Sequence, residues 1–273
     1  MKWTFTSNPE VYAGAAEAWL LRDPVRNTVL ITILRAIRGG LWGDDVLMGW
    51  AERDGETVAS ALQTASHPLL LADMPEEAVR ELAAVLIEAE RKVPAVTGPL
   101  VLAETFAAAW WRPGLERRSE RLYRLGSLVP PSHLPEGGAR TASGEDLELL
   151  VEWTTAFQID AGGHAPPDLT PLIASRIGRH ELVLWEVDGR SVACAGASAP
   201  IAGMSRVGPV YTPPEERGKG YGTAVTHAVT AKVRSEGATE VLLFTDLSNP
   251  TSNAIYQAIG YRPVADYASI VFA

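Results

Sequence analysis

The sequence predicts an α/β fold with a mixed sheet, built from two similar units in tandem. Two strand-like runs joined by an Asp-Gly pair occur at 54–55 and again at 188–189. Asp-Gly favours a tight hairpin because both turn positions tolerate positive φ. Around each hairpin the same patterns recur, roughly ααβββαβα. The Pro- and Gly-rich stretch "LVPPSHLPEGGART", 128–141, predicts a linker between the halves.

Each element follows from its own pattern of apolar residues, spaced as on a helix or as on a strand. In the first half we expect helices over 9–23, 27–39 and 75–92, the hairpin within 45–64, a strand over 98–104 and a helix over 105–111. In the second half we expect helices over 144–160, 167–179 and 220–237, the hairpin within 181–199, strands over 208–212 and 240–246, and a helix over 253–259. The predicted domains are therefore 1–130 and 138–273.

Composition narrows the function classes. The net charge of −9 argues against nonspecific binding to nucleic acid or to an anionic membrane. One cysteine, Cys194, excludes an intrachain disulfide and fits a reducing cytoplasm. The N-terminal residues lack the apolar core of a signal peptide, and the longest aliphatic run, 28–34, is far short of a membrane span. We expect a cytoplasmic protein. The histidines have no ligand spacing, so no metal site is predicted.

The stretch "YTPPEERGKGYGTA", 211–224, sets the second half apart from the first. Three glycines, Gly218, Gly220 and Gly222, lie between a predicted strand and a predicted helix, and the corresponding loop of the first half has none. A helix N-terminus presents unpaired N–H groups, and glycines let a large anion approach them, so phosphate is the expected ligand. Arg217 and Lys219 add positive charge. A plain left-handed turn before a helix is the alternative.

Two phosphate-binding motifs do not fit this loop. A P-loop requires Ser or Thr directly after its lysine, but Lys219 is followed by Gly220. A dinucleotide-binding loop requires a third glycine where Thr223 stands. The pattern that fits is R-x-x-G-x-G, formed by Arg217, Gly220 and Gly222.

With this motif, residues 140–273 resemble the GNAT superfamily of acyl-CoA-dependent N-acyltransferases. The resemblance includes, in order, "GPVYT", "RGKGYG" and its helix, "VLLFTD", and "LSNPTSNAIYQAIGYRPV". The last stretch is similar to the FR47-like branch, which is related to glycine N-acyltransferase. The first half then resembles a degenerate GNAT copy. The implied fold is two GNAT-like units in tandem, and the implied cosubstrate is acetyl-CoA or another acyl-CoA.

The resemblance also implies how acyl-CoA is held. Backbone groups of Val210, Tyr211 and Thr212 would bind the pantetheine arm as an added strand does. The pyrophosphate would lie against N–H groups of the loop, namely those of Gly218, Lys219, Gly220, Tyr221, Gly222 and Thr223. A backbone N–H near Tyr211 would polarise the thioester carbonyl.

Three residues near the C-terminus receive roles from the same resemblance. An asparagine like Asn253 reaches the CoA arm, with Asn249 beside it. Alternatively, Asn249 shapes a turn before Pro250 and Ser252 caps the helix. Tyr256 lies where the family places a tyrosine near the thioester sulfur, so its phenol is the expected general acid. The alternative is a core tyrosine.

The general base stays open among Glu186, Asp246, Asp160 and His164, with water as a further choice. We expect an enzyme that acylates a primary amine of a small molecule or peptide. The rival reading is a catalytically silent acyl-CoA-binding regulator or sensor. The acceptor, the acyl chain length and formation of a homodimer are left open by the sequence.

Overall fold

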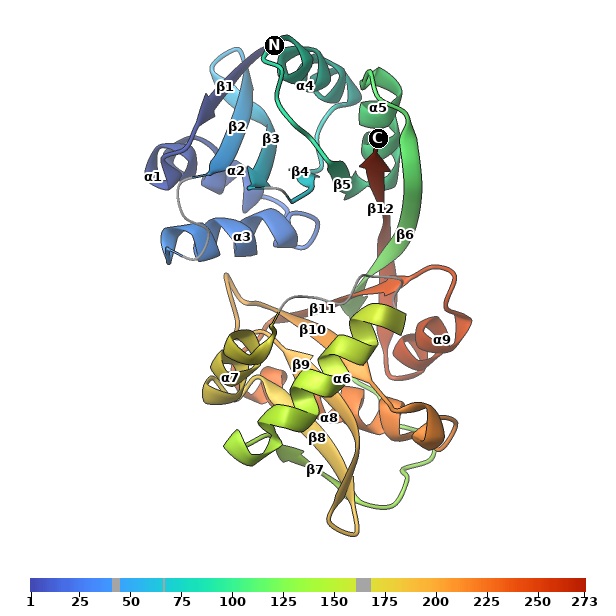
Figure 1. Cartoon of the computed structure of the whole chain (residues 1–273). Coiled ribbons are helices and arrows are strands. Elements are labelled where there is room, and N and C mark those ends of the chain that lie inside the picture. Colours follow the sequence, from blue (N-terminus) through green and yellow to red (C-terminus); the bar gives the residue numbers. More distant parts are fainter. Residues whose placement is uncertain (41–44, 66, 161–167) are drawn as a thin grey trace. The chain divides into compact units, whose positions relative to one another are not determined.

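A computed structural model describes residues 1–40, 45–65, 67–160 and 168–273, and the chain divides into two compact units (Figure 1). The first unit contains Met1–Leu122, Asp246–Ser248 and Val264–Ala273. The second contains Tyr123–Thr245 and Asn249–Pro263. Strands β6 (Gly114–Leu125) and β12 (Tyr261–Phe272) therefore contribute residues to both units.

The sheet of the first unit is mixed. Its strand order is β1-β2-β3-β4-β5-β12-β6, with β1 at Lys2–Thr6, β2 at Val46–Arg53, β3 at Glu56–Thr64, β4 at Leu69–Leu71 and β5 at Ala95–Pro99. The β2–β3 hairpin turns at the predicted Asp-Gly pair, and β4 and β5 run parallel. Residues Tyr267–Val271 of β12 pair antiparallel with β5. The last strand of the chain thus completes the sheet of the first unit.

Helices of the first unit bury their apolar faces on this sheet. They are α1 (Pro9–Tyr12), the π-helical η1 (Ala13–Glu17), α2 (Ala18–Leu20), α3 (Thr28–Arg38), α4 (Glu76–Glu88) and α5 (Leu100–Ala109). One core joins α4 and α5 to Ala59 and Ala61 of β3. Ser60 lies between those alanines, so its side chain points to the other face, where it bonds the Tyr12 hydroxyl at 2.5 Å.

Some sequence expectations for local structure were wrong. The strand predicted over 98–104 ends at Pro99, and α5 begins at Leu100. A short apolar run fits a strand or a buried helix equally well, and length did not decide between them here. The predicted linker 128–141 is also too long, because Gly138–Thr141 forms β7.

The second unit has the strand order β12-β6-β11-β10-β9-β8-β7. Its further strands are β8 (Leu182–Val187), β9 (Arg190–Ala197), β10 (Met204–Tyr211) and β11 (Glu240–Asp246). The helical elements are η2 (Gly144–Asp146), α6 (Leu147–Asp160), α7 (Thr170–Gly178), η3 (Pro214–Glu216), α8 (Tyr221–Ser235) and α9 (Pro250–Ala258). Strands β10 and β11 run parallel, while β8 and β9 form the hairpin predicted at 188–189.

Alternate residues of β8 face two different cores. Val183 and Trp185 pack with α8, whereas Leu182 and Leu184 pack with α6 and α7. Figure 1 shows α6 on one side of these strands and α8 behind them. The sheet is therefore buried on both faces, which explains its long apolar strands. Across the described ranges, no helix combines the length and apolar character that crossing a membrane requires.

Asp146 fixes the start of α6 and gives a test of stability against pH. Its carboxylate accepts two bonds from Arg140, both at 2.8 Å, and one from the Ser143 N–H at 2.7 Å. Its side chain is 9% exposed. The bonds from Arg140, and then that from Ser143, lower the pKa of Asp146 to about 2 against its burial. The folded form therefore favours the ionised carboxylate.

We expect Asp146→Asn to lower the free energy of unfolding by about 1–2 kcal/mol at pH 7. Because the folded pKa lies below the unfolded one, this contribution is present above about pH 4 and is lost as pH falls toward 2. Urea unfolding at a series of pH values measures the difference. Glu145→Gln, on an exposed neighbour in the same turn, is the control and should change little. A difference that persists unchanged to pH 2 would contradict this account.

Candidate active site

The glycine loop places an uncapped helix end beside a strand end. Gly218 and Gly220 have φ of +78° and +87°, a backbone region that other residues rarely adopt. Gly220 is the N-cap of α8 and, as a glycine, provides no side-chain capping bond to the first turn of the helix. The N–H of Ala224 bonds to the Gly220 carbonyl at 3.1 Å. The N–H groups preceding Ala224 are therefore arranged to receive an anion.

Strand β10 leaves its parallel neighbour before it reaches this loop. The β10–β11 register ends at the pair Val207–Leu243, although both strands continue. Beyond a register shift, β10 pairs with β9 through Val210–Ala195 and Tyr211–Cys194. The β11 side of Val210 and Tyr211 is thus outside the parallel register. This is the geometry in which an extended ligand can add as a strand.

The backbone of Thr212 is less open than the sequence implied. Its carbonyl accepts a bond from Arg217 Nε at 3.0 Å. A Cβ on Gly222 would lie 3.3 Å from Thr212 Oγ1, which is tighter than an ordinary contact. Glycine at 222 therefore lets α8 begin close to the end of β10.

Both cations of the loop are already paired with carboxylates. Arg217 Nη2 bonds to Asp160 at 2.6 Å, and Lys219 Nζ bonds to Glu216 at 2.8 Å. Arg190 forms a second ion pair with Glu216 at 2.7 Å. The bond from Lys219, followed by the charges of Arg190 and Lys219, holds the pKa of Glu216 below its usual range against the effect of burial. Main-chain N–H groups and the helix dipole are left as the main attraction for a diphosphate.

Helix α9 carries the other predicted residues. Asn249 is its N-cap and accepts the Ser252 N–H at 3.0 Å, so capping by Ser252 was wrong. The Asn253 amide bonds to the Asn249 carbonyl at 2.7 Å and to the Tyr123 hydroxyl at 2.8 Å. Sequence reasoning missed Tyr123, because it lies on β6, a strand for which no pattern was recognised.

Tyr256 is buried in the core of the second unit. It is 8% exposed, and its ring meets that of Tyr261 edge-on at 6.2 Å. Burial raises the pKa of Tyr256 to about 12, and a hydrogen bond with the Ser252 side chain opposes the rise. The phenol is therefore protonated at neutral pH and can donate a hydrogen bond. Tyr261 bonds to Thr230 at 2.8 Å, as a packing residue does.

The candidate general bases differ in the groups that they pair with in the structure. Asp160 pairs with Arg217, and Glu186 pairs with Arg140 at 2.6 Å. Asp246 belongs to the first unit and accepts two bonds from Ser248, each at 2.6 Å. His164 lies outside the described residues.

A further carboxylate, Glu120, was missed by the sequence analysis. Partial desolvation, and then repulsion from Asp246, raises its pKa, although the side chain keeps contact with solvent. Both carboxylates belong to the first unit. Glu120 lies in the charged stretch "ERRSER", which contains no pattern that distinguishes one carboxylate from another.

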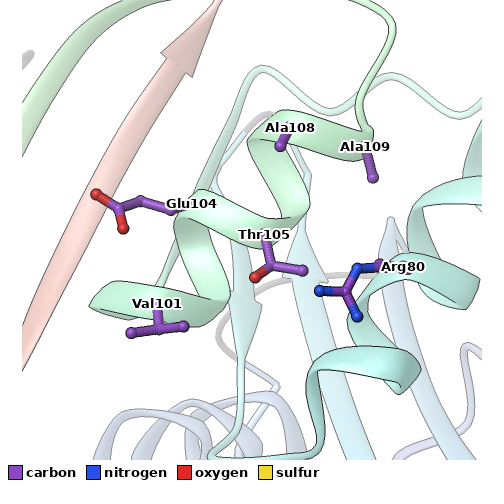
Figure 2. A pocket seen from close by; sticks show the side chains of 6 residues that line it. All are labelled: Arg80, Val101, Glu104, Thr105, Ala108 and Ala109. Atoms are coloured by element: carbon purple, nitrogen blue, oxygen red, sulfur yellow. The ribbon is translucent and has the colours of Figure 1, made fainter.

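A groove in the first unit contains none of the predicted site residues. Its volume is about 450 Å³, and it is lined by Arg80, Val101, Glu104, Thr105, Ala108 and Ala109. In Figure 2 the guanidinium of Arg80 faces Thr105, while the Glu104 carboxylate points away from Arg80. Arg80 pairs with Glu76 and Glu104 with Arg117, each at 2.6 Å. The charged groups of the groove are thus already engaged. The described residues also include no cluster of three or more His, Cys, Asp or Glu that could hold a metal ion.

The sequence model of the acetyltransferase (GNAT) family matches residues 147–261, which include the glycine loop and α9. This segment belongs to the GNAT family. The GNAT acetyltransferases take the acyl group from acyl-CoA. The general family model matches here, and the FR47-like branch stays a prediction.

Relatives of known structure share the GNAT fold along nearly the whole chain. A GCN5-related N-acetyltransferase from Sphaerobacter thermophilus superposes with a TM-score of 0.68 and 19% identity, over 98% of this chain and 94% of that one. A tandem GNAT protein from the clavulanic acid biosynthesis pathway superposes with a TM-score of 0.55 and 11% identity, over 98% of each chain. These likenesses confirm the predicted fold of two GNAT-like units in tandem.

A shorter match is found among curated sequences. A mycothiol acetyltransferase from Thermobispora bispora is 39% identical over 66 residues. The match covers 24% of this chain and 21% of that protein, so the chain spans about a fifth of this relative's length.

Proposed function

We propose that this protein is an N-acyltransferase that transfers an acetyl or other acyl group from acyl-CoA to a primary amine. The observation that carries the proposal is the uncapped N-terminus of α8, with Gly218 and Gly220 at positive φ beside the diverging end of β10. A diphosphate fits such a helix end, and an extended pantetheine arm fits such a strand edge. The names of the similar proteins support acetyl as the group transferred.

The reaction needs few side chains. The amine nitrogen attacks the thioester carbonyl carbon, the C–S bond breaks, and the sulfur leaves with the bonding electrons. We assign Val210, Tyr211 and the loop N–H groups to binding, and a backbone N–H near Tyr211 to the developing oxyanion. Tyr256 donates a hydrogen bond to the departing sulfur, and the proton released by the amine passes to a base or to water.

Charge pairing in the loop gives Arg217 and Lys219 a second role in this proposal. When a diphosphate enters, each cation can exchange its carboxylate for a phosphate oxygen without leaving the loop. The exchange releases Asp160, which then becomes available to accept a proton. Binding of acyl-CoA would in this way prepare a base as well as a donor.

The alternative is an acyl-CoA-binding protein without activity. One observation favours it: Asp160 and Glu186, the two candidate bases of the second unit that the structure describes, are both ion-paired with arginines. A carboxylate held by a guanidinium is a weak base. Both functions predict that the protein binds acyl-CoA. Only the acyltransferase is expected to transfer the acyl group to an amine.

Two measurements with the intact chain separate these proposals. We expect calorimetry to detect binding of acetyl-CoA, and free thiol to appear only when a primary amine is added. The amine panel includes amino acids, polyamines, amino sugars and peptides with a free N-terminus. Binding without turnover on any amine supports the silent protein. A titration of folded protein that gives no heat with acetyl-CoA, acyl-CoA of longer chain or CoA overturns both.

A further inference from the structure

A chain of directed hydrogen bonds connects β6 to α9 inside the second unit. The Gln257 Nε2 group donates to the Tyr123 hydroxyl at 3.1 Å, and that hydroxyl donates to Asn253 Oδ1 at 2.8 Å. Asn253 Nδ2 in turn donates to the Asn249 carbonyl at 2.7 Å. The chain ends at Asn249, the N-cap of α9, about two helical turns before Tyr256. The four residues of this chain and Tyr256 all lie in the second unit.

The order of donors in this chain is fixed by chemistry. A backbone carbonyl only accepts, so the Asn253 nitrogen must face Asn249 and its oxygen must face Tyr123. The phenol therefore donates to Asn253 and accepts from Gln257. Tyr123 is fully buried, whereas Asn253 is only half-buried. The buried Tyr123 hydroxyl thus holds the oxygen of the more accessible Asn253 amide, and the Asn249 carbonyl holds its nitrogen.

We propose that Tyr123 is a positioning residue for acyl-CoA binding, acting by holding the amide of Asn253 in one orientation. This inference rests on the proposed function and on the contact with the CoA arm that the family resemblance implies for Asn253. Without the hydroxyl, the Asn253 oxygen loses the bond from Tyr123, and the amide is held less firmly in this orientation. An Asn253 amide that is already held in place loses little rotational freedom when acyl-CoA binds, so binding is tighter.

The test compares two tyrosines of the same core. Tyr123→Phe and Tyr261→Phe each remove one buried hydroxyl and keep the ring, but the Tyr261 hydroxyl bonds to Thr230 of α8, whereas that of Tyr123 bonds to Asn253 of α9. We expect Tyr123→Phe to raise the Kd of acetyl-CoA about 5- to 10-fold, the size of one lost hydrogen bond. Tyr261→Phe should stay within about twofold. Thermal unfolding of both variants shows whether their losses of stability match.

A double-mutant cycle decides whether Tyr123 acts through Asn253. If it does, Tyr123→Phe should change the Kd less than about twofold once Asn253→Ala is present. Gln257→Ala, at an exposed position, is the second variant and should weaken binding in the same direction by about 2-fold. Equal affinity of Tyr123→Phe and the parent, or full additivity with Asn253→Ala, overturns the inference. A parent chain that does not bind acetyl-CoA overturns the proposed function instead.

Discussion

Replacing Gly220 by alanine is expected to weaken acetyl-CoA binding by about 10- to 100-fold. A left-handed alanine costs about 1–2 kcal/mol, and we expect the loop to shift its backbone to relieve that strain. Gly220 has φ of +87° and is the N-cap of α8. A Cβ there would meet no atom of the chain nearer than Pro135, at 3.9 Å, so the folded protein has room for it. The loss would therefore come from displaced N–H groups and from the methyl facing the ligand. Calorimetric titration measures the effect.

Gly237 provides a matched control at the other end of the same helix. It follows the C-cap of α8 with φ of +98°, and a Cβ there would meet nothing within 4 Å. Gly237→Ala should therefore cost similar stability, about 1 kcal/mol, without changing the Kd. If both variants bind acetyl-CoA like the parent, the loop at 217–223 does not hold the diphosphate.

The parts that the sequence predicted correctly are governed by neighbouring residues. The Asp-Gly pairs predicted both hairpins, because a two-residue turn with positive φ depends on the turn residues themselves. The glycine loop likewise predicted where α8 begins: the expected helix starts at 220, and α8 runs over Tyr221–Ser235 with Gly220 as its N-cap. The strand expected over 98–104 failed because its apolar run is equally suited to a helix, and only tertiary packing decides such cases.

The parts that the sequence did not predict depend on residues far apart in the chain. Arg217 and Asp160 are 57 positions apart, and Tyr123 and Asn253 are 130 apart. No local pattern predicts that Arg217 is held by a carboxylate, so its charge was assigned wholly to a phosphate. The contribution of Val264–Ala273 to the first unit is equally remote, because the residues of the second unit lie between β5 and this part of β12 in the sequence.

Replacing Tyr256 by phenylalanine is expected to lower kcat about 100-fold, the lower end of the range for a general acid, with little change in the KM for acetyl-CoA. Burial raises the pKa of this phenol to about 12, whereas an ordinary thiol has a pKa of about 8.5. Complete proton transfer to the thiolate is therefore uphill by about 5 kcal/mol. The phenol acts by hydrogen bonding to the sulfur as charge develops, which explains why we expect the smaller effect. Steady-state kinetics with the best amine of the panel measures it.

The pH profile and a second tyrosine test this role independently. Because the pKa of Tyr256 is raised to about 12, the phenol keeps its proton from pH 6 to pH 10 and should cause no fall in kcat within that range. Tyr261→Phe removes a hydroxyl from the ring that contacts Tyr256 edge-on, and it should leave kcat within about twofold of the parent. If Tyr256→Phe also retains the parent kcat, Tyr256 is a core residue of α9 and the departing sulfur takes its proton from water.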